Sequence, residues 1–125
     1  MDLIKFFFKL QLDLKMYHWV TLSYPRHVAS GTLHDSLITL IDKFMEVYQG
    51  KYNRVSSKDF SITVTNYSDD YIINVLQEAA NILHSLDNGS EILESSIQPH
   101  DTDLLNIRDE MLASINQTIY LFKLR

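Results

Sequence analysis

Two histidines and two acids in the first half of the chain could together bind a transition metal. They are His18, His27, Asp42 and Glu46. Imidazole nitrogen and carboxylate oxygen are ligands that iron, zinc and manganese accept. On a helix, Asp42 and Glu46 share a face because they lie four residues apart. These four groups either meet at one metal ion or are unrelated polar residues, and the functional interpretation depends on which is true.

The composition narrows the classes of protein to consider. The 125 residues suit a single domain, which we expect to span residues 1–125. The absence of cysteine excludes a disulfide framework, a zinc ribbon and thiol catalysis. A net charge of −5 without a basic cluster makes nucleic acid an unexpected partner. No apolar run has the length of a membrane span, so we expect a cytoplasmic protein with no membrane partner.

The pattern of apolar residues predicts an all-α fold. Only three glycines and two prolines interrupt the chain, which favours long helices over a sheet with many tight turns. Four segments carry apolar residues at steps of three and four, the spacing of a helix with one buried face. The helices are expected over about residues 2–21, 25–49, 68–87 and 101–122.

Turn and cap residues mark the ends of these helices. Ser23 can cap the second helix, Pro25 suits its first turn, and Gly50 stands where a helix C-terminal glycine belongs. Asp101 or Asp103 is expected to cap the last helix. These signals place a short turn between the first two helices and a long connection before the third.

That long connection determines the expected architecture. Residues 60–65 alternate apolar with hydroxyl side chains, which predicts a short extended segment on the outside of the fold. A short turn makes neighbouring helices antiparallel, and a long crossover lets a second hairpin dock beside the first. We therefore expect a ferritin-like four-helix bundle, built from two antiparallel hairpins joined by a long crossover.

The end of the first helix resembles a known family. The residues Tyr17-His18-Trp19 are similar to the His-Trp signature of the mini-ferritins called Dps. The following spacing is also similar, with fifteen residues from His27 to Asp42 and four more to Glu46. Gly31 departs from the pattern, because Dps proteins often carry an acidic residue there.

The resemblance implies an iron site shared between subunits. In Dps proteins the two histidines come from one subunit and the two acids from its dimer mate. The implied metal ligands are therefore His18 and His27 of one chain and Asp42 and Glu46 of another, with iron as the metal and a homo-oligomer as the assembly.

A second resemblance points to viruses. The segments Tyr48-Gln49-Gly50-Lys51-Tyr52 and Asn106-Ile107-Arg108-Asp109-Glu110-Met111 are similar to small ferritin-like proteins of phages and large DNA viruses. This resemblance implies a virion component and no particular activity.

The helical pattern around Asp42 and Glu46 indicates whether a metal could bind inside the bundle or on its surface. The apolar residues of the second helix set the direction of its core, and Asp42 and Glu46 point roughly opposite to it. A di-iron bundle carries Glu and Glu-x-x-His ligands inward, and the second half of this chain has no Glu-x-x-His. An internal di-iron centre is therefore not expected, whereas outward-facing acids suit a site shared with another copy.

Each candidate also has a structural interpretation. Asp42 and Glu46 could be solvated charges, His18 a half-buried histidine bonded to a carbonyl, and His27 a local cap. His34 is expected to be structural, while His84 and His100 are expected at the surface. Tyr17 and Trp19 are expected to serve packing, in the core or an interface.

Two functions follow from these alternatives. The first is a Dps-like iron-binding or ferroxidase-type protein with a metal site shared between subunits. The second is a non-enzymatic structural or assembly protein, such as a viral or phage virion component, that keeps the ferritin-like fold without metal chemistry. Its partners would then be other proteins of a larger assembly.

Overall fold

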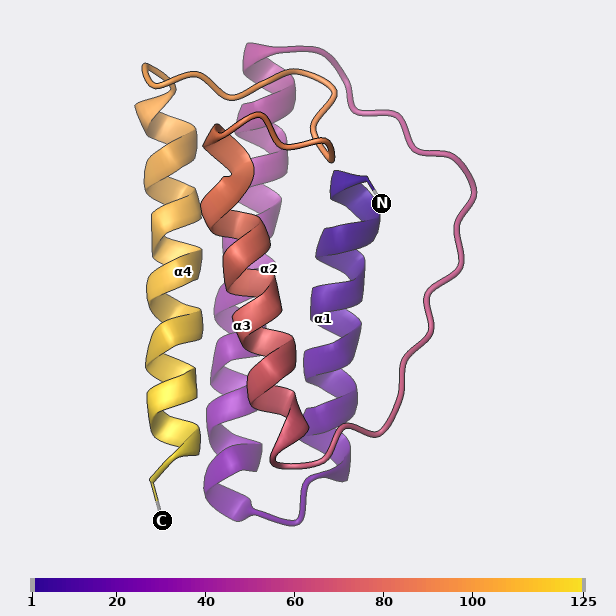
Figure 1. The fold of residues 1–125 in the computed structure, drawn as a ribbon, viewed down its shortest axis with the longest axis vertical. Coiled ribbons are helices and arrows are strands. Elements are labelled where there is room, and N and C mark those ends of the chain that lie inside the picture. The colour runs from indigo at the N-terminus through magenta and orange to yellow at the C-terminus, as the bar shows by residue number, and fades with distance from the viewer. Residues whose placement is uncertain (1, 125) are drawn as a thin grey trace.

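The computed structural model describes residues 2–124, and within them the chain forms four α-helices and no strand. They are α1 (Leu3–Val20), α2 (Tyr24–Lys51), α3 (Tyr71–His84) and α4 (Thr102–Phe122), with one 3₁₀ turn, η1 (Ser85–Asp87), directly after α3. The all-α prediction is confirmed. Figure 1 shows α1 and α2 as one antiparallel hairpin, α3 and α4 as a second, and a crossover that runs the length of the molecule between them.

Polar residues before α1 and α2 cap these helices, and the cap at Ser23 was predicted from the sequence. The carboxylate of Asp2 accepts a hydrogen bond of 2.8 Å from the backbone N–H of Lys5. The hydroxyl of Ser23 accepts one of 3.3 Å from Arg26, and Pro25 stands in the first turn of α2. α3 begins at Tyr71, three residues later than predicted, and its N-cap residue Asp70 makes no side-chain cap bond, whereas the hydroxyl of Ser68 accepts from the N–H of Tyr71 at 3.1 Å.

The predictions for the facing ends of α2 and α4 were only partly right. α2 continues through Gly50 to Lys51, and the N–H of Tyr52 closes it on the carbonyl of Tyr48 at 3.0 Å. Asp101 precedes α4, but its carboxylate does not cap that helix. It accepts instead from the N–H of Gln98 at 2.9 Å and from the hydroxyl of Tyr52, and lies 2.8 Å from Nζ of Lys51.

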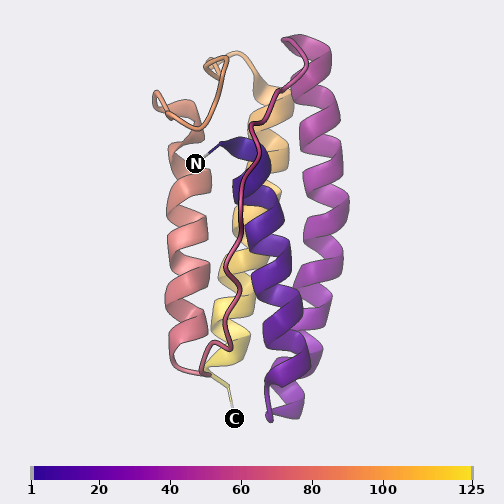
Figure 2. The same cartoon turned by 90° about the vertical axis from the view of Figure 1, so that its right-hand side faces the viewer.

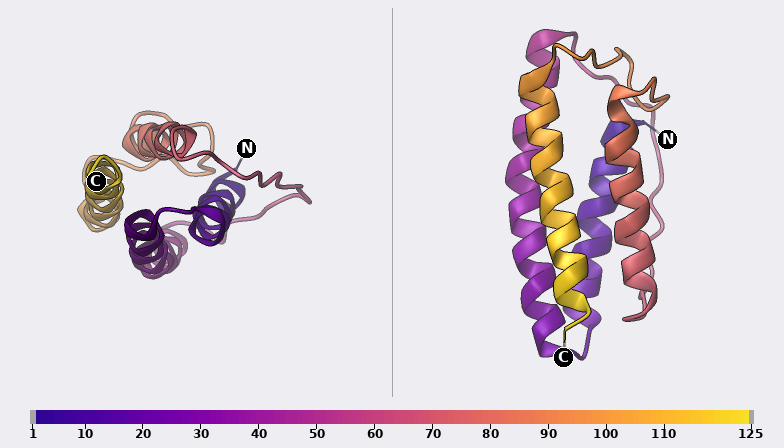
Figure 3. Two further views of the ribbon diagram at one scale, coloured as in Figure 1. Left: turned by 90° about the horizontal axis from the view of Figure 1, so that it is seen from below. Right: turned by 60° about the vertical axis from the view of Figure 1, so that its left-hand side comes forward.

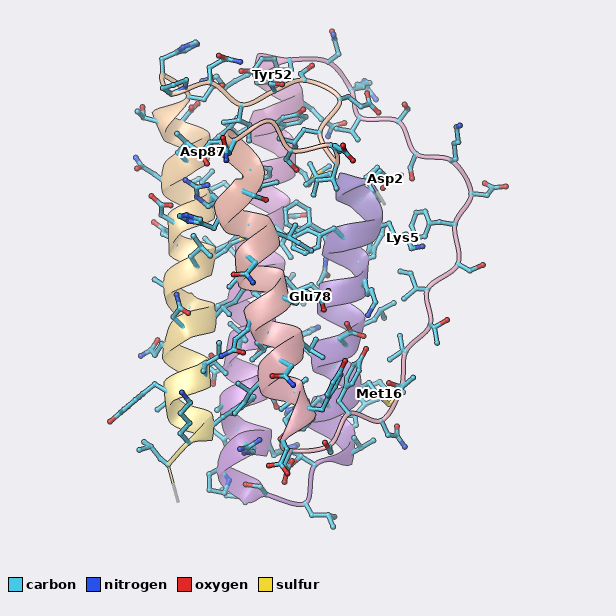
Figure 4. All side chains as sticks on the ribbon, in the orientation of Figure 1. Asp2, Lys5, Met16, Tyr52, Glu78 and Asp87 are labelled. Carbon is cyan, nitrogen blue, oxygen red and sulfur yellow. The ribbon has the colours of Figure 1, made fainter. Side chains whose placement is uncertain are left out.

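These contacts explain why Asp101 is not free to cap. Its side chain is buried, and its contacts with Lys51 and Tyr52 join the start of α4 to the end of α2, where Figure 4 labels Tyr52. Burial favours the neutral acid, but hydrogen bonds from Lys51, Tyr52 and the N–H of Gln98 outweigh it. They hold the pKa of Asp101 well below its ordinary value.

The core lies between the two hairpins. α2 packs against both α1 and α4, and α3 packs against α4, as the end-on view in Figure 3 shows. The fully buried large side chains come from all four helices and η1. Among them are Leu3, Leu14, Tyr17, Leu33, Leu37, Phe44, Tyr48, Ile72, Leu76, Leu83, Leu86, Leu104, Met111, Ile115 and Phe122.

α1 and α3 are separated by an open groove of about 310 Å³. Phe6, Leu10 and Ala79 are among its apolar lining residues, and Lys5 and Glu78 line it from α1 and α3 (Figure 4). Each hairpin is therefore joined to the other chiefly through α2 and α4.

The crossover, residues 53–67, has no regular secondary structure and lies along α1 (Figure 2). Its first part is held by Ser56, whose hydroxyl donates to Glu94 at 2.9 Å, and by Ser57, which donates to Asp2 at 2.8 Å. Its last residue, Tyr67, donates to Asp13 of α1 at 3.3 Å. The expected extended connection on the outside of the fold is confirmed.

Among the described residues, none of the helices combines the length and apolar character that crossing a membrane requires.

Candidate metal centre

His18 and His27 meet where α1 ends and α2 begins. Nδ1 of His18 lies 2.7 Å from the backbone carbonyl oxygen of His27, and Nδ1 of His27 lies 2.7 Å from the carbonyl oxygen of His18. The two imidazole rings stack, with centroids 3.9 Å apart and planes inclined by 15°. The two candidate ligands nine residues apart in the sequence therefore form one reciprocal pair.

This pairing fixes which nitrogen of each ring carries the proton. A carbonyl oxygen only accepts hydrogen bonds, so Nδ1 is the protonated nitrogen of both rings. In a neutral imidazole, Nε2 then keeps its lone pair and can bind a metal. Metal-binding histidines commonly have their other ring nitrogen bonded to a backbone carbonyl in this way. The donor chemistry of the pair fits a transition-metal ion.

Ser30 and Gly31, on the next turn of α2, complete the surroundings of the pair. The buried hydroxyl of Ser30 donates to the carbonyl oxygen of His27 at 3.1 Å and lies 3.4 Å from Nδ1 of His18. A Cβ added at Gly31 would lie only 2.8 Å from Cε1 of His18. The ring of His18 thus occupies the space that any side chain at residue 31 would need, including the acidic one of the Dps pattern.

Asp42 and Glu46 lie on the solvent-exposed side of α2, as the sequence predicts. Fifteen residues of continuous helix separate Asp42 from His27, a distance of about 22 Å along the axis. Residues 2–124 contain no group of three or more His, Cys, Asp or Glu side chains that could hold a metal ion. Within one chain, therefore, the two histidines lie together, but the two acids lie far from the histidines.

The remaining candidates lie as follows. His34 is buried in α2 with Nδ1 3.4 Å from Asp35, which agrees with a structural role. His84 and His100 are exposed, as expected. Tyr17 is in the core, whereas the side chain of Trp19 is 67% exposed and contributes nothing to the core of its own chain.

The sequence interpretation missed Arg26, which ties this end of the molecule together. Its guanidinium donates to the carbonyl oxygen of Phe122 at 2.7 Å, to the hydroxyl of Tyr17 at 3.2 Å and to the carbonyl oxygen of Asp69. No spacing rule could have identified Asp69 and Phe122 as partners, because they lie 43 and 96 residues away along the chain. Ser30 and Gly31, in contrast, stand three and four residues after His27, where helical neighbours are expected.

The fold and this end of the molecule define a class of protein. It is an all-helical domain whose four helices pack together and whose first hairpin holds two histidines against each other's backbone. The chain belongs to a family of unknown function, DUF5856, whose model matches residues 18–122. The matched region includes His18, His27, Asp42 and Glu46. No curated protein and no solved structure matches the chain.

Proposed function

We propose that this chain is a ferritin-like, Dps-like protein that binds and oxidises iron(II) at a site shared between two copies. His18 and His27 of one chain would supply imidazole nitrogens, and Asp42 and Glu46 of the second chain would supply carboxylate oxygens. The observation that carries the proposal is the reciprocal bonding of the two imidazoles, which places a proton on Nδ1 of each ring and so directs metal binding to Nε2.

The direction of the helices supports the ferritin-like part of the proposal. α1 and α4 run one way, and α2 and α3 run the other way, because the crossover returns the chain to the end at which α2 began (Figure 1). A bundle with one long crossover of this kind is the ferritin-like connection.

The position of the acids supports a site between chains. Asp42 and Glu46 are both exposed and share one side of α2, so they are free to meet groups from another molecule. The helix between them and His27 prevents an approach within one chain. Both acids add to the net charge of −5, which favours cation binding.

The outer surface of α1 supports a second copy as the partner. Phe8, Leu12 and Trp19 are 51%, 46% and 67% exposed and lie in one row, four and then seven residues apart. We call these three side chains the apolar row. Lys15 lies in the same row, with its ammonium 5.9 Å from the centroid of the Trp19 ring. A basic and apolar α1 complements the acidic outer side of α2 that carries Asp42 and Glu46.

The chemistry supplied by bound iron is a one-electron oxidation at each metal ion. Hydrogen peroxide accepts the electrons of two iron(II) ions together with two protons and leaves as two water molecules. The residues of this chain hold and orient the metal, and the solvent-exposed position of the acids leaves coordination sites open to the oxidant.

Anaerobic iron(II) titration tests the proposal. Wild type should bind iron with a stoichiometry that the double variant Asp42→Ala, Glu46→Ala loses. A second double variant, Glu91→Ala, Glu110→Ala, removes two other exposed acids and should bind iron as wild type does. Equal stoichiometry in wild type and in the first variant would end the iron proposal.

A second candidate function is a structural or assembly protein, including a viral or phage virion component. The observation that favours it is the amount of large apolar surface left exposed, together with the finding that no more than the two histidines come together as possible ligands within residues 2–124. Under this function, alanine at His18, His27, Asp42 and Glu46 leaves assembly unchanged, and elemental analysis of the purified protein finds no bound iron.

A further inference from the structure

The middle of the crossover leaves its backbone hydrogen-bonding groups without partners. From Phe60 to Ser68 the chain has nine residues with no charge, no glycine and no proline. Within residues 2–124, no backbone N–H or C=O group of residues 59–66 has a hydrogen-bond partner, and the segment runs as an elongated trace without helix or turn (Figure 1). Proteins usually protect such an edge with charges, prolines or bulges, because it offers a template for another strand.

The side chains of this segment fit a sheet. Ile62, Thr63, Val64 and Thr65 are β-branched, and apolar residues alternate with hydroxyl residues from Phe60 onward. Ile62 and Val64 are partly buried, whereas Ser61, Thr63 and Thr65 are exposed. Ile62 and Val64 are thus less exposed than the hydroxyl residues on either side of them, as on a strand with one sheltered face.

We propose that residues 59–65 pair with the same segment of a second copy, as a two-stranded antiparallel ladder centred on Ile62. In this register Ile62 lies opposite itself, Phe60 lies opposite Val64, and Ser61 lies opposite Thr63. Each apolar side chain thus meets an apolar one and each hydroxyl a hydroxyl, because both residues of a pair are the same distance from the centre.

Charge also favours a second copy as the partner. At the edge of the ladder Lys58 lies opposite Asn66 and Asp59 lies opposite Thr65, so no like charges oppose each other. The crossover lies along α1, the helix that carries the apolar row (Figure 2). The ladder pairs backbone groups and needs no metal, so it does not depend on the proposed iron site.

The absence of cysteine makes a crosslinking test direct. The variant Ile62→Cys places two thiols opposite each other across the twofold axis, within the distance that a disulfide spans. The matched variant Thr65→Cys places its two thiols about 20 Å apart, because six residues of strand separate them. Under mild oxidation of metal-free protein, the first should become a covalent dimer and the second should remain monomeric on a denaturing gel.

Hydrogen exchange gives a second measurement on the unmodified chain. The amides of residues 60–64 should be protected in concentrated protein and should lose that protection on dilution. The proposal is overturned if neither variant crosslinks and these amides exchange at unprotected rates at every concentration. Crosslinking of both variants would also overturn it. In that case residue 62 would lie opposite residue 62 of the second chain and residue 65 opposite residue 65, which requires parallel strands in register.

Discussion

Asp13 and Asp101 are both buried aspartates, yet their surroundings shift their pKa values in opposite directions. Burial raises the pKa of Asp13, and the bonds from Lys9 at 2.7 Å and Tyr67 at 3.3 Å only partly offset it. At Asp101 burial is outweighed by Lys51, Tyr52 and the N–H of Gln98, so the pKa is lowered. The number of hydrogen-bond donors and their distances from the carboxylate therefore decide whether its pKa is raised or lowered.

The two aspartates should therefore give opposite pH dependences of stability. Asp101 has a lowered pKa, so its charge stabilises the fold above the unfolded pKa of about 3.9, and this contribution is lost as the pH falls. Relative to Asp101→Asn, wild type should lose free energy of unfolding as the pH decreases from 5 toward 2. Urea unfolding at several pH values measures this difference.

The contribution of Asp13 to stability should depend on pH in the opposite direction. Its raised pKa favours the protonated acid in the folded state, so its contribution is present at low pH and is lost as the pH rises through the folded pKa. The free energy of unfolding of wild type, relative to Asp13→Asn, should fall as the pH rises above the unfolded pKa of about 3.9. Parallel curves for the two variants would contradict the opposite shifts.

Gly31 allows a test of the histidine pair by stability alone. Gly50→Ala meets no atom within 4 Å, so the better helix propensity of alanine should stabilise the protein by up to about 1 kcal/mol. Gly31→Ala places a Cβ 2.8 Å from Cε1 of His18 and should be less stable than Gly50→Ala by about 1–3 kcal/mol. Thermal or urea unfolding compares the two.

The His18→Ala background provides the control for this comparison. Without the imidazole, Gly31→Ala should become as stabilising as Gly50→Ala, because the close approach no longer exists. If Gly31→Ala changes the free energy of unfolding by the same amount with and without the His18 side chain, then the imidazole of His18 does not lie against residue 31.

At the scale of elements, Arg108 joins the end of α3 to α4. Its guanidinium donates to the carbonyl oxygens of Leu83 at 3.1 Å and His84 at 3.2 Å, and to Asp87 at 3.2 Å. The last carbonyls of a helix have no partner within it. A buried side chain of α4 therefore satisfies the C-terminus of α3 and holds η1 in place.

Replacing Arg108 should be costly. Arg108→Met keeps the apolar bulk but leaves these carbonyls unsatisfied, and we expect a loss of about 2–4 kcal/mol in the free energy of unfolding. Asp109→Asn is the matched variant, since it removes only an exposed partner of the same guanidinium and should cost less than about 1 kcal/mol. Urea unfolding gives both values, and equal small losses would contradict this role of Arg108.

The helices were predictable from the sequence because local signals set their ends. The capping hydroxyl of Ser23 and the turn at Pro25 act within four residues of the helix that they start. Asp101 was not predictable, because its carboxylate is drawn away from α4 by Lys51 and Tyr52, some fifty residues earlier in the chain. At this position, long-range contacts of the carboxylate replace the local hydrogen bond that would cap α4.

For the candidate site, the sequence correctly placed Asp42 and Glu46 on the exposed side of α2, and the metal role of these acids and of His18 and His27 stays a prediction. The sequence could not give the reciprocal bonds between the histidines, because these depend on how α1 meets the turn into α2. Nor could it give the exposure of Trp19, which any pattern of apolar residues counts toward the core.

At the scale of the whole molecule, the apolar row on α1 predicts self-association. Leu12→Glu puts a charge into the middle of the row without touching the core, so it should shift sedimentation toward the monomer while the helical circular dichroism signal is retained. Tyr120→Glu changes another exposed side chain on α4, 61% exposed, and should sediment as wild type does. Identical sedimentation of all three proteins would remove the row as an interface.

The open groove between α1 and α3 affects which helices unfold locally first. The helices that border it are each supported mainly from one side, whereas α2 is supported from two sides, by α1 and α4. Local opening costs least where few buried contacts are lost. The outermost turns of α1 and α3 should thus exchange their amide protons early, and the pair formed by α2 and α4 should retain them until the whole chain unfolds.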